Sequence, residues 1–123
     1  MLFRSYVLLT EPDLFDGYVI VSPSLWYHDK WLFDYAAKAV KERQRLAATA
    51  YLAVGDFEGG SMVPDLKNFT ARLQAYDFEG FTVRGEVLTD ETHNSVFPRA
   101  VSNGIRMIWP RETGRAWAAA ADQ

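Results

Sequence analysis

The sequence predicts an α/β fold with a three-stranded, mostly parallel sheet and flanking helices. Short apolar runs alternate with longer segments of helical periodicity, and no repeat or low-complexity stretch interrupts them. The predicted order is one helix, followed three times by a strand and a helix. Such alternation is typical of parallel strands joined by right-handed crossovers. The 123 residues suffice for one core, so we expect a single domain over residues 1–123.

The N-terminal part is predicted to contain a helix and a buried strand. Leu2–Leu9 is apolar and is expected to be helical. It ends near Glu11, because Pro12 disfavours helix at the residue before it. Leu14–Gly17 has the composition of a turn. The continuous apolar run Tyr18–Val21 suits a strand that is buried on both faces, as in a parallel sheet.

The middle of the chain predicts the second helix and the second strand. Asp29–Arg45 is expected to be helical, with Asp29 as its N-cap. One stripe of this helix carries residues at a spacing of four: Trp31, Tyr35 and Ala39. Ala50–Val54 has the pattern of a buried strand, and the glycine-rich loop Gly55–Gly60 follows it.

The C-terminal half predicts a helix, a strand, a polar loop and a further helix, over Val63–Tyr76, Phe81–Leu88, Thr89–Ser95 and Phe97–Trp109. Pro64 is tolerated in the first turn of its helix. Gly104 is expected to weaken the last helix. The alanine-rich tail Arg111–Gln123 is expected to add a short helix or to fray.

Composition excludes several classes of protein. An apolar fraction of 49% argues against disorder. The net charge is -3 and no basic stripe is present, so no nucleic-acid partner is expected. The densest cationic group, Lys38–Arg45, complements the dipole at the end of a predicted helix. No cysteine is present, which excludes disulfides and thiolate metal sites.

No segment predicts a membrane or export role. Met1–Thr10 is apolar but lacks the basic region and cleavage site of a signal peptide. No apolar run approaches the roughly 20 residues that cross a bilayer. We therefore expect a cytoplasmic location and no membrane partner.

Candidate chemistry gathers in the loops that follow the three predicted strands: Ser22–Tyr27, Gly55–Gly60 and Thr89–Ser95. In open parallel sheets, sites form beyond the carboxyl ends of the strands. His93 has the residue type of a general base, and Asp56 or Glu58 could orient its imidazole. The alternatives are an exposed loop histidine and a solvated turn.

The remaining polar residues carry weaker signals. Ser22 and Ser24 are interpreted as turn or cap residues, because neither lies in a G-x-S-x-G motif. Trp26 and Tyr27 are interpreted as pocket walls or core. His28 has no evident partner, and the two histidines are too far apart in sequence to predict a metal site.

Three stretches resemble esterases of the enterochelin and salmochelin type, within the α/β-hydrolase superfamily. They read EPDLFDGYVIVSPSLWY, YLAVGDFEGG and DETHNSVFPRAVSNGIR. The resemblance extends from Leu2 to about Trp109. It implies a partial α/β-hydrolase fold and a serine-ester hydrolase mechanism, with no cofactor expected. The site residues that it implies are the base His93, the acid Glu58 or, as second choice, Asp56, and two substrate contacts, Trp26 and Ser24. Some members of the family work with a serine–histidine pair alone.

The chain departs from that family at its N-terminus. The nucleophile of the family lies in a G-x-S-x-G elbow, and this motif occurs nowhere in the sequence. The resemblance places the nucleophile about three residues before Met1. We therefore expect the C-terminal part of a carboxylic ester hydrolase that is inactive alone, whether it is an expression fragment, a split gene or a start codon assigned too late. The alternative is a non-catalytic interaction or structural module.

Two structural expectations follow. Because the loops after the second and third strands leave the same edge of the sheet, an oxygen of Glu58 or Asp56 is expected within hydrogen-bonding reach of His93, about 2.6–3.2 Å. The strand Tyr18–Val21 is expected to be an apolar edge without charge or proline, which invites pairing with another chain. A homo-oligomer is therefore expected, with a small-molecule ester as the substrate of the full-length parent.

Overall fold

The computed structural model describes residues 2–11, 15–42 and 45–110. Its sheet has three strands in the order β1 (Gly17–Val21), β2 (Arg45–Gly55) and β3 (Glu79–Leu88). Both strand pairs are parallel, as the alternating pattern predicts. The predicted tail over residues 111–123 lies outside the described residues.

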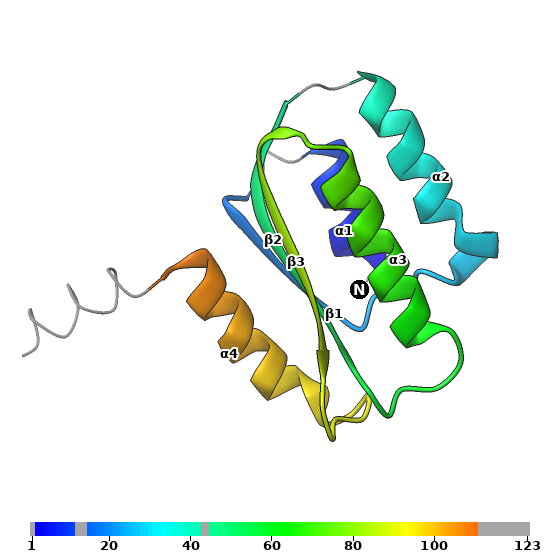
Figure 1. The fold of residues 1–123 in the computed structure, drawn as a ribbon, viewed down its shortest axis with the longest axis vertical. Helices are drawn as coiled ribbons and strands as arrows, with labels where there is room; N and C mark the ends of the chain where they lie inside the picture. The colour runs from blue at the N-terminus through cyan, green and yellow to red at the C-terminus, as the bar shows by residue number, and fades with distance from the viewer. Residues whose placement is uncertain (1, 12–14, 43–44, 111–123) are drawn as a thin grey trace, which may run out of the picture.

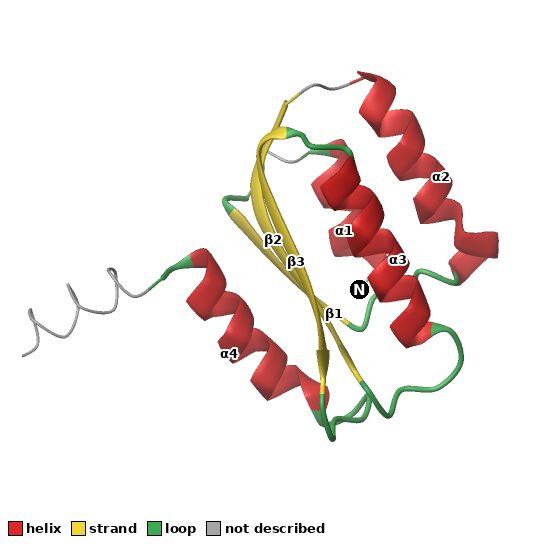
Figure 2. Ribbon diagram, viewed as in Figure 1, coloured by secondary structure: helices red, strands yellow, loops and turns green. Residues whose placement is uncertain are grey.

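Within the described residues, four helices flank the sheet on two sides. The helices α1 (Leu2–Thr10), α2 (Tyr27–Glu42) and α3 (Met62–Ala75) lie on one side, and α4 (Val96–Ile108) covers the other (Figures 1 and 2). The central strand β2 therefore has helices over both faces and a hydrogen-bonded neighbour at each edge. This accounts for the continuous apolar run of its second half, which is typical of buried parallel strands.

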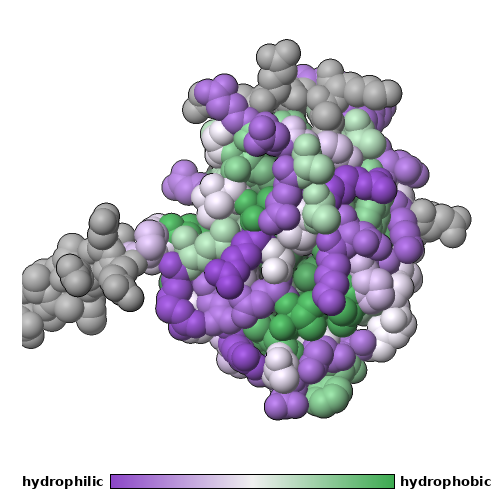
Figure 3. Space-filling view, in the orientation of Figure 1, coloured by the Kyte–Doolittle hydropathy of each residue, from purple (hydrophilic) through white to green (hydrophobic). Residues whose placement is uncertain are grey.

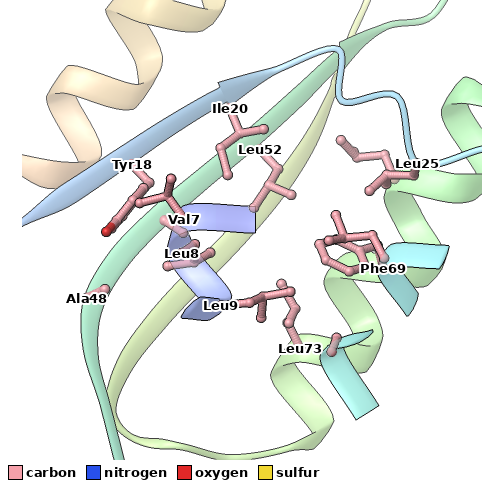
Figure 4. Close-up of a cluster of buried hydrophobic side chains, with 14 of the residues drawn as sticks. Val7, Leu8, Leu9, Tyr18, Ile20, Leu25, Ala48, Leu52, Phe69 and Leu73 are labelled. Carbon is pink, nitrogen blue, oxygen red and sulfur yellow. The ribbon is translucent and has the colours of Figure 1, made fainter. Parts of the chain in front are cut away.

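The larger core lies between the sheet and the three helices on its first side. Figure 4 shows Leu8 and Leu9 of α1 close to Leu52 of β2, with Phe69 and Leu73 of α3 beside them. All five side chains are at most 2% exposed. Burial of apolar surface of this extent is the main favourable term in folding.

The second helix differs from its prediction. It begins at Tyr27, so Asp29 lies inside the first turn and is not the N-cap. Arg45, predicted as its last residue, is instead the first residue of β2. The predicted stripe is only partly buried. Trp31 is exposed and stacks against Tyr35, whereas the residues that face the core are Leu32, Phe33, Ala36 and Ala39.

Gly104 allows α4 to lie close to the sheet. A β-carbon at this position would stand 2.7 Å from a methyl carbon of Val19 and 3.1 Å from the ring of Tyr51. Val96, Ala100 and Gly104 recur at a spacing of four and are all buried against the strands. The glycine therefore has a packing function, so the expectation that it only weakens the helix is incomplete.

The surface in the orientation of Figure 1 is mostly hydrophilic, with hydrophobic residues gathered in patches between the hydrophilic ones (Figure 3). No helix within the described ranges is long and apolar enough to cross a membrane.

Candidate active site

Three loops meet at the carboxyl ends of the parallel strands, at the lower end of the molecule in Figure 1. The loop after β1 begins at Ser22, the loop after β2 contains Glu58, and the loop after β3 contains His93. The register of β1, β2 and β3 ends these strands side by side, with Val21 opposite Ala53 and Gly55 opposite Leu88. Residues from three distant parts of the sequence therefore share one small region.

Glu58 is the centre of this region. Its side chain is only 2% exposed. One carboxylate oxygen, Oε2, accepts hydrogen bonds from the backbone N–H of Gly55 at 2.6 Å and from the hydroxyl of Ser22 at 2.8 Å. A buried carboxylate needs such donors, because an ion without partners is costly to remove from water. Two of its possible acceptor positions are thus occupied by the residue that follows β1 and the last residue of β2.

His93 lies against the second oxygen of the same carboxylate. Its Nδ1 is 2.7 Å from Oε1 of Glu58. The side chain of His93 is 70% exposed, so the acid is buried while the imidazole faces solvent. A carboxylate bound to Nδ1 favours a proton on that nitrogen, which leaves Nε2 as the acceptor. This arrangement supports an imidazole that removes a proton from a third group.

Asp56, the second candidate for the acid, lies elsewhere. Its Oδ1 accepts the backbone N–H of Glu91 at 3.3 Å, and its own N–H donates to Leu88 at 3.0 Å. The backbone N–H of Phe57 also donates to the carbonyl of Glu91 at 3.1 Å. Asp56 therefore helps to join the two loops, and the contact to His93 comes from Glu58.

The loop that carries His93 is further braced by the start of α4. The Ser95 hydroxyl donates to a carboxylate oxygen of Glu91 at 2.6 Å, and it accepts the backbone N–H of Thr92 at 2.9 Å. Arg99 donates to the carbonyl of Thr89 at 2.7 Å. These bonds fix the backbone on both sides of His93 although the loop is exposed.

An open cavity of about 540 Å³ lies beside the Glu58–His93 pair. Its lining contains both residues of the pair, neighbours of each in their own loops, the loop after β1 and the start of α3: Ser24, Trp26, Phe57, Gly59, Met62, Thr92 and Asn94. Trp26 and Phe57 are large side chains that are 53% and 64% exposed. Both predicted substrate contacts, Trp26 and Ser24, thus border the same cavity as His93. Tyr27, predicted as core or pocket wall, is exposed and is not part of this lining.

Ser22 is the residue whose place sequence reasoning missed. It was interpreted as a turn or cap residue, yet its buried hydroxyl binds Glu58. A signal was present in the sequence, because Ser22 directly follows a buried strand at the edge where Glu58 was expected. The side chain of His28 lies outside the described residues. Over the described part of the chain, no group of three or more histidine, aspartate or glutamate residues could hold a metal ion.

The sheet order, the flanking helices and the position of the site define a partial α/β-hydrolase fold. No protein-family model matches the sequence, and no curated protein matches it. Solved structures do match. The BES protein from Bacillus cereus superimposes with a TM-score of 0.73 and 26% identity, over 86% of this chain and 40% of that chain.

Two further solved structures have the same fold. The siderophore hydrolase EstA from Aspergillus nidulans gives a TM-score of 0.74 and 22% identity, covering 87% of this chain and 43% of its own. An IroE-like serine hydrolase from Shewanella oneidensis gives a TM-score of 0.72 and 21% identity, and the match covers 85% of this chain and 35% of that chain. The chain therefore shares its fold with these three structures and spans less than half the length of each.

Proposed function

We propose that this chain supplies the histidine and the acid of a serine esterase that hydrolyses carboxylic esters. The observation that carries the proposal is the buried Glu58 carboxylate, held by two donors and bound to Nδ1 of the exposed His93. An acid in this position orients the imidazole and stabilises the imidazolium that forms during acyl transfer.

The proposed roles follow from this geometry. His93 would accept the proton of an attacking serine hydroxyl through Nε2 and then return it to the leaving alcohol. Glu58 would stay ionised throughout. Trp26 and Ser24 would contact the substrate in the neighbouring cavity. No hydroxyl within the described ranges is hydrogen-bonded to His93, so the nucleophile would have to come from a G-x-S-x-G segment outside this sequence.

The class of ester is proposed from the similar structures. Two of them are named as siderophore hydrolases or IroE-like hydrolases, so siderophore esters are the first class to test. The exposed rings of Trp26 and Phe57 beside the base support a substrate with apolar surface near its ester bond.

The isolated chain is expected to be inactive. Removing members of a serine triad costs roughly 10⁴–10⁶-fold in turnover. The test compares the purified chain with His93→Ala on a p-nitrophenyl ester. Equal background rates are expected, and a rate that disappears in the variant would contradict inactivity.

The complementary test restores the nucleophile. If the DNA upstream of the first codon encodes an in-frame G-x-S-x-G, the extended chain should hydrolyse the ester, and His93→Ala should abolish that hydrolysis. An extended chain that binds no ester and hydrolyses none would favour the alternative, a non-catalytic module with the hydrolase fold.

We also propose that a second copy of the chain pairs along β1. In this structure β1 pairs with β2 alone, and its other edge has no strand beside it among the described residues. An apolar strand at the edge of a sheet favours association with another strand. A two-fold contact is the most common symmetry for such a pair.

A further inference from the structure

The loop after β1 contains a residue with an unusual backbone conformation. Ser22 has a φ of 49°, in the left-handed region that glycine adopts more readily than other residues. Its backbone N–H donates to the carbonyl of Ala53 at 2.7 Å, which continues the β1–β2 ladder by one step. The conformation is therefore fixed by the sheet and turns the side chain at the point where the strand ends.

The hydroxyl of Ser22 is the feature that glycine would lack. A glycine would adopt this φ without strain, whereas serine adopts it at a cost in free energy. Strained conformations of this kind gather at functional sites. Here the buried hydroxyl donates to Oε2 of Glu58 at 2.8 Å across 36 positions of sequence.

Two donors, the last residue of β2 and the residue that follows β1, determine how the carboxylate of Glu58 is turned. The backbone N–H of Gly55 and the hydroxyl of Ser22 both bind Oε2, so the remaining oxygen, Oε1, is directed at His93. With a single donor the carboxylate could rotate about that one bond. The N–H of Gly55 belongs to the backbone and cannot be removed by a side-chain substitution. Of the two donors to Oε2, the hydroxyl of Ser22 is therefore the one that a substitution can remove.

We propose that Ser22 is a positioning residue, which orients Glu58 and thereby holds the proton of His93 on Nδ1. The importance of this for catalysis rests on the proposed esterase function. The positioning itself does not, because the tautomer of His93 can be measured in this chain without any nucleophile. A proton fixed on Nδ1 keeps Nε2 free to accept, and a histidine in the wrong tautomer loses most of its catalytic value.

The experiment is long-range ¹H–¹⁵N NMR of the full chain labelled with ¹⁵N-histidine, at a pH where the imidazole is neutral. The chain has two histidines, so a His28→Gln background leaves the signal of His93 alone. In this background the Nδ1–H tautomer should predominate. Ser22→Ala and Ser22→Gly should both shift His93 toward a mixture of tautomers. Ser24→Ala removes another hydroxyl of the same loop and should leave the tautomer unchanged.

The variants separate the possible outcomes. Ser22→Gly relieves backbone strain and so keeps a folded protein available if Ser22→Ala unfolds. A folded Ser22→Gly with an unchanged tautomer would overturn the proposal and leave Ser22 a purely structural residue. Glu58→Gln must itself shift the tautomer. If it does not, the Glu58–His93 pair does not form in solution, and the assignment of Glu58 as the acid fails independently of Ser22.

Discussion

The carbonyl oxygen of Glu91 lies so close to Gly55 that a β-carbon on the glycine would stand 2.2 Å from it. This contact brings the loop after β3 against the end of β2. It involves backbone on the Glu91 side, which cannot move aside as a flexible side chain could. The position of His93, two residues beyond Glu91, thus depends on a residue without a side chain.

Gly55→Ala is therefore expected to displace the loop that carries His93. Inserting an extra carbon into such a contact costs about 1–3 kcal/mol. Chemical denaturation should show that loss, and NMR should show altered signals around His93. Gly59→Ala is the matched control, because no atom lies within 4 Å of a β-carbon at that glycine. Equal losses for both variants would mean that the close approach is relaxed in solution.

Glu58 and Asp56, the two candidate acids, should respond differently when the carboxylate of each is replaced by an uncharged amide. In a chain extended to carry the nucleophile, Glu58→Gln should lower kcat by roughly 10³–10⁴-fold, because the imidazole loses its orienting carboxylate. Asp56→Asn retains an oxygen that accepts the N–H of Glu91, so a much smaller effect is expected. Steady-state kinetics of both variants decides the question. A larger loss for Asp56→Asn would reassign the acid.

The buried hydroxyl of Tyr51 leads us to expect that the folded protein loses stability in alkaline solution. The hydroxyl is buried and makes no hydrogen bond to the described residues, although Asn103 and Glu86 lie near enough to influence it. Burial raises the pKa of Tyr51 above 10.0, and the Asn103 amide opposes part of that rise. The folded state therefore binds this proton more tightly than the unfolded state does. The resulting stabilisation is complete below pH 10.0, and it is lost as the pH rises through the higher pKa that Tyr51 has in the folded state.

Tyr51→Phe should reduce this alkaline loss. At neutral pH its effect on the free energy of unfolding should stay within about 1 kcal/mol, since no hydrogen bond is removed. Tyr18→Phe is the comparison, because that hydroxyl donates to the carbonyl of Glu11 at 3.2 Å. Urea unfolding at neutral and alkaline pH measures both variants. If Tyr51→Phe loses as much stability in alkaline solution as the unchanged chain, that loss is due to another titrating group.

The proposed pairing along β1 predicts the size of the particle in solution. Light scattering coupled to size exclusion should give about twice the chain mass of 14.0 kDa or a larger multiple. Amide hydrogen exchange should be slow on both edges of β1. A single species of 14.0 kDa that stays soluble at high concentration would show that the edge is not used.

The order of the elements was predictable because each buried strand carries a dense apolar run. Tyr18–Val21 and Ala50–Val54 lie within β1 and β2, and the predicted three-stranded parallel sheet is confirmed. The first half of β2 was missed. Its alanines at 47 and 48 favour helix by intrinsic propensity, and pairing with neighbouring strands overrides that preference.

The site was predictable only as a set of loops. The common direction of parallel strands places His93 near both carboxylates, but it does not choose between Glu58 and Asp56. That choice depends on which side chain turns inward after Gly55, and on a hydroxyl supplied by the loop after β1. Neither the positive φ of Ser22 nor its bond to Glu58 leaves a periodic trace in the sequence.

The central position of β2 has a consequence for local unfolding. Over Thr49–Ala53 it is paired with a strand on both sides, whereas β3 lies at an edge of the sheet. Edge elements open at a lower free energy than central ones. Glu58 is therefore anchored to the segment that opens last, and His93 to one that opens earlier. Partial opening of β3 will separate base from acid while most of the core is still intact, so the pair will be lost before global unfolding is detected.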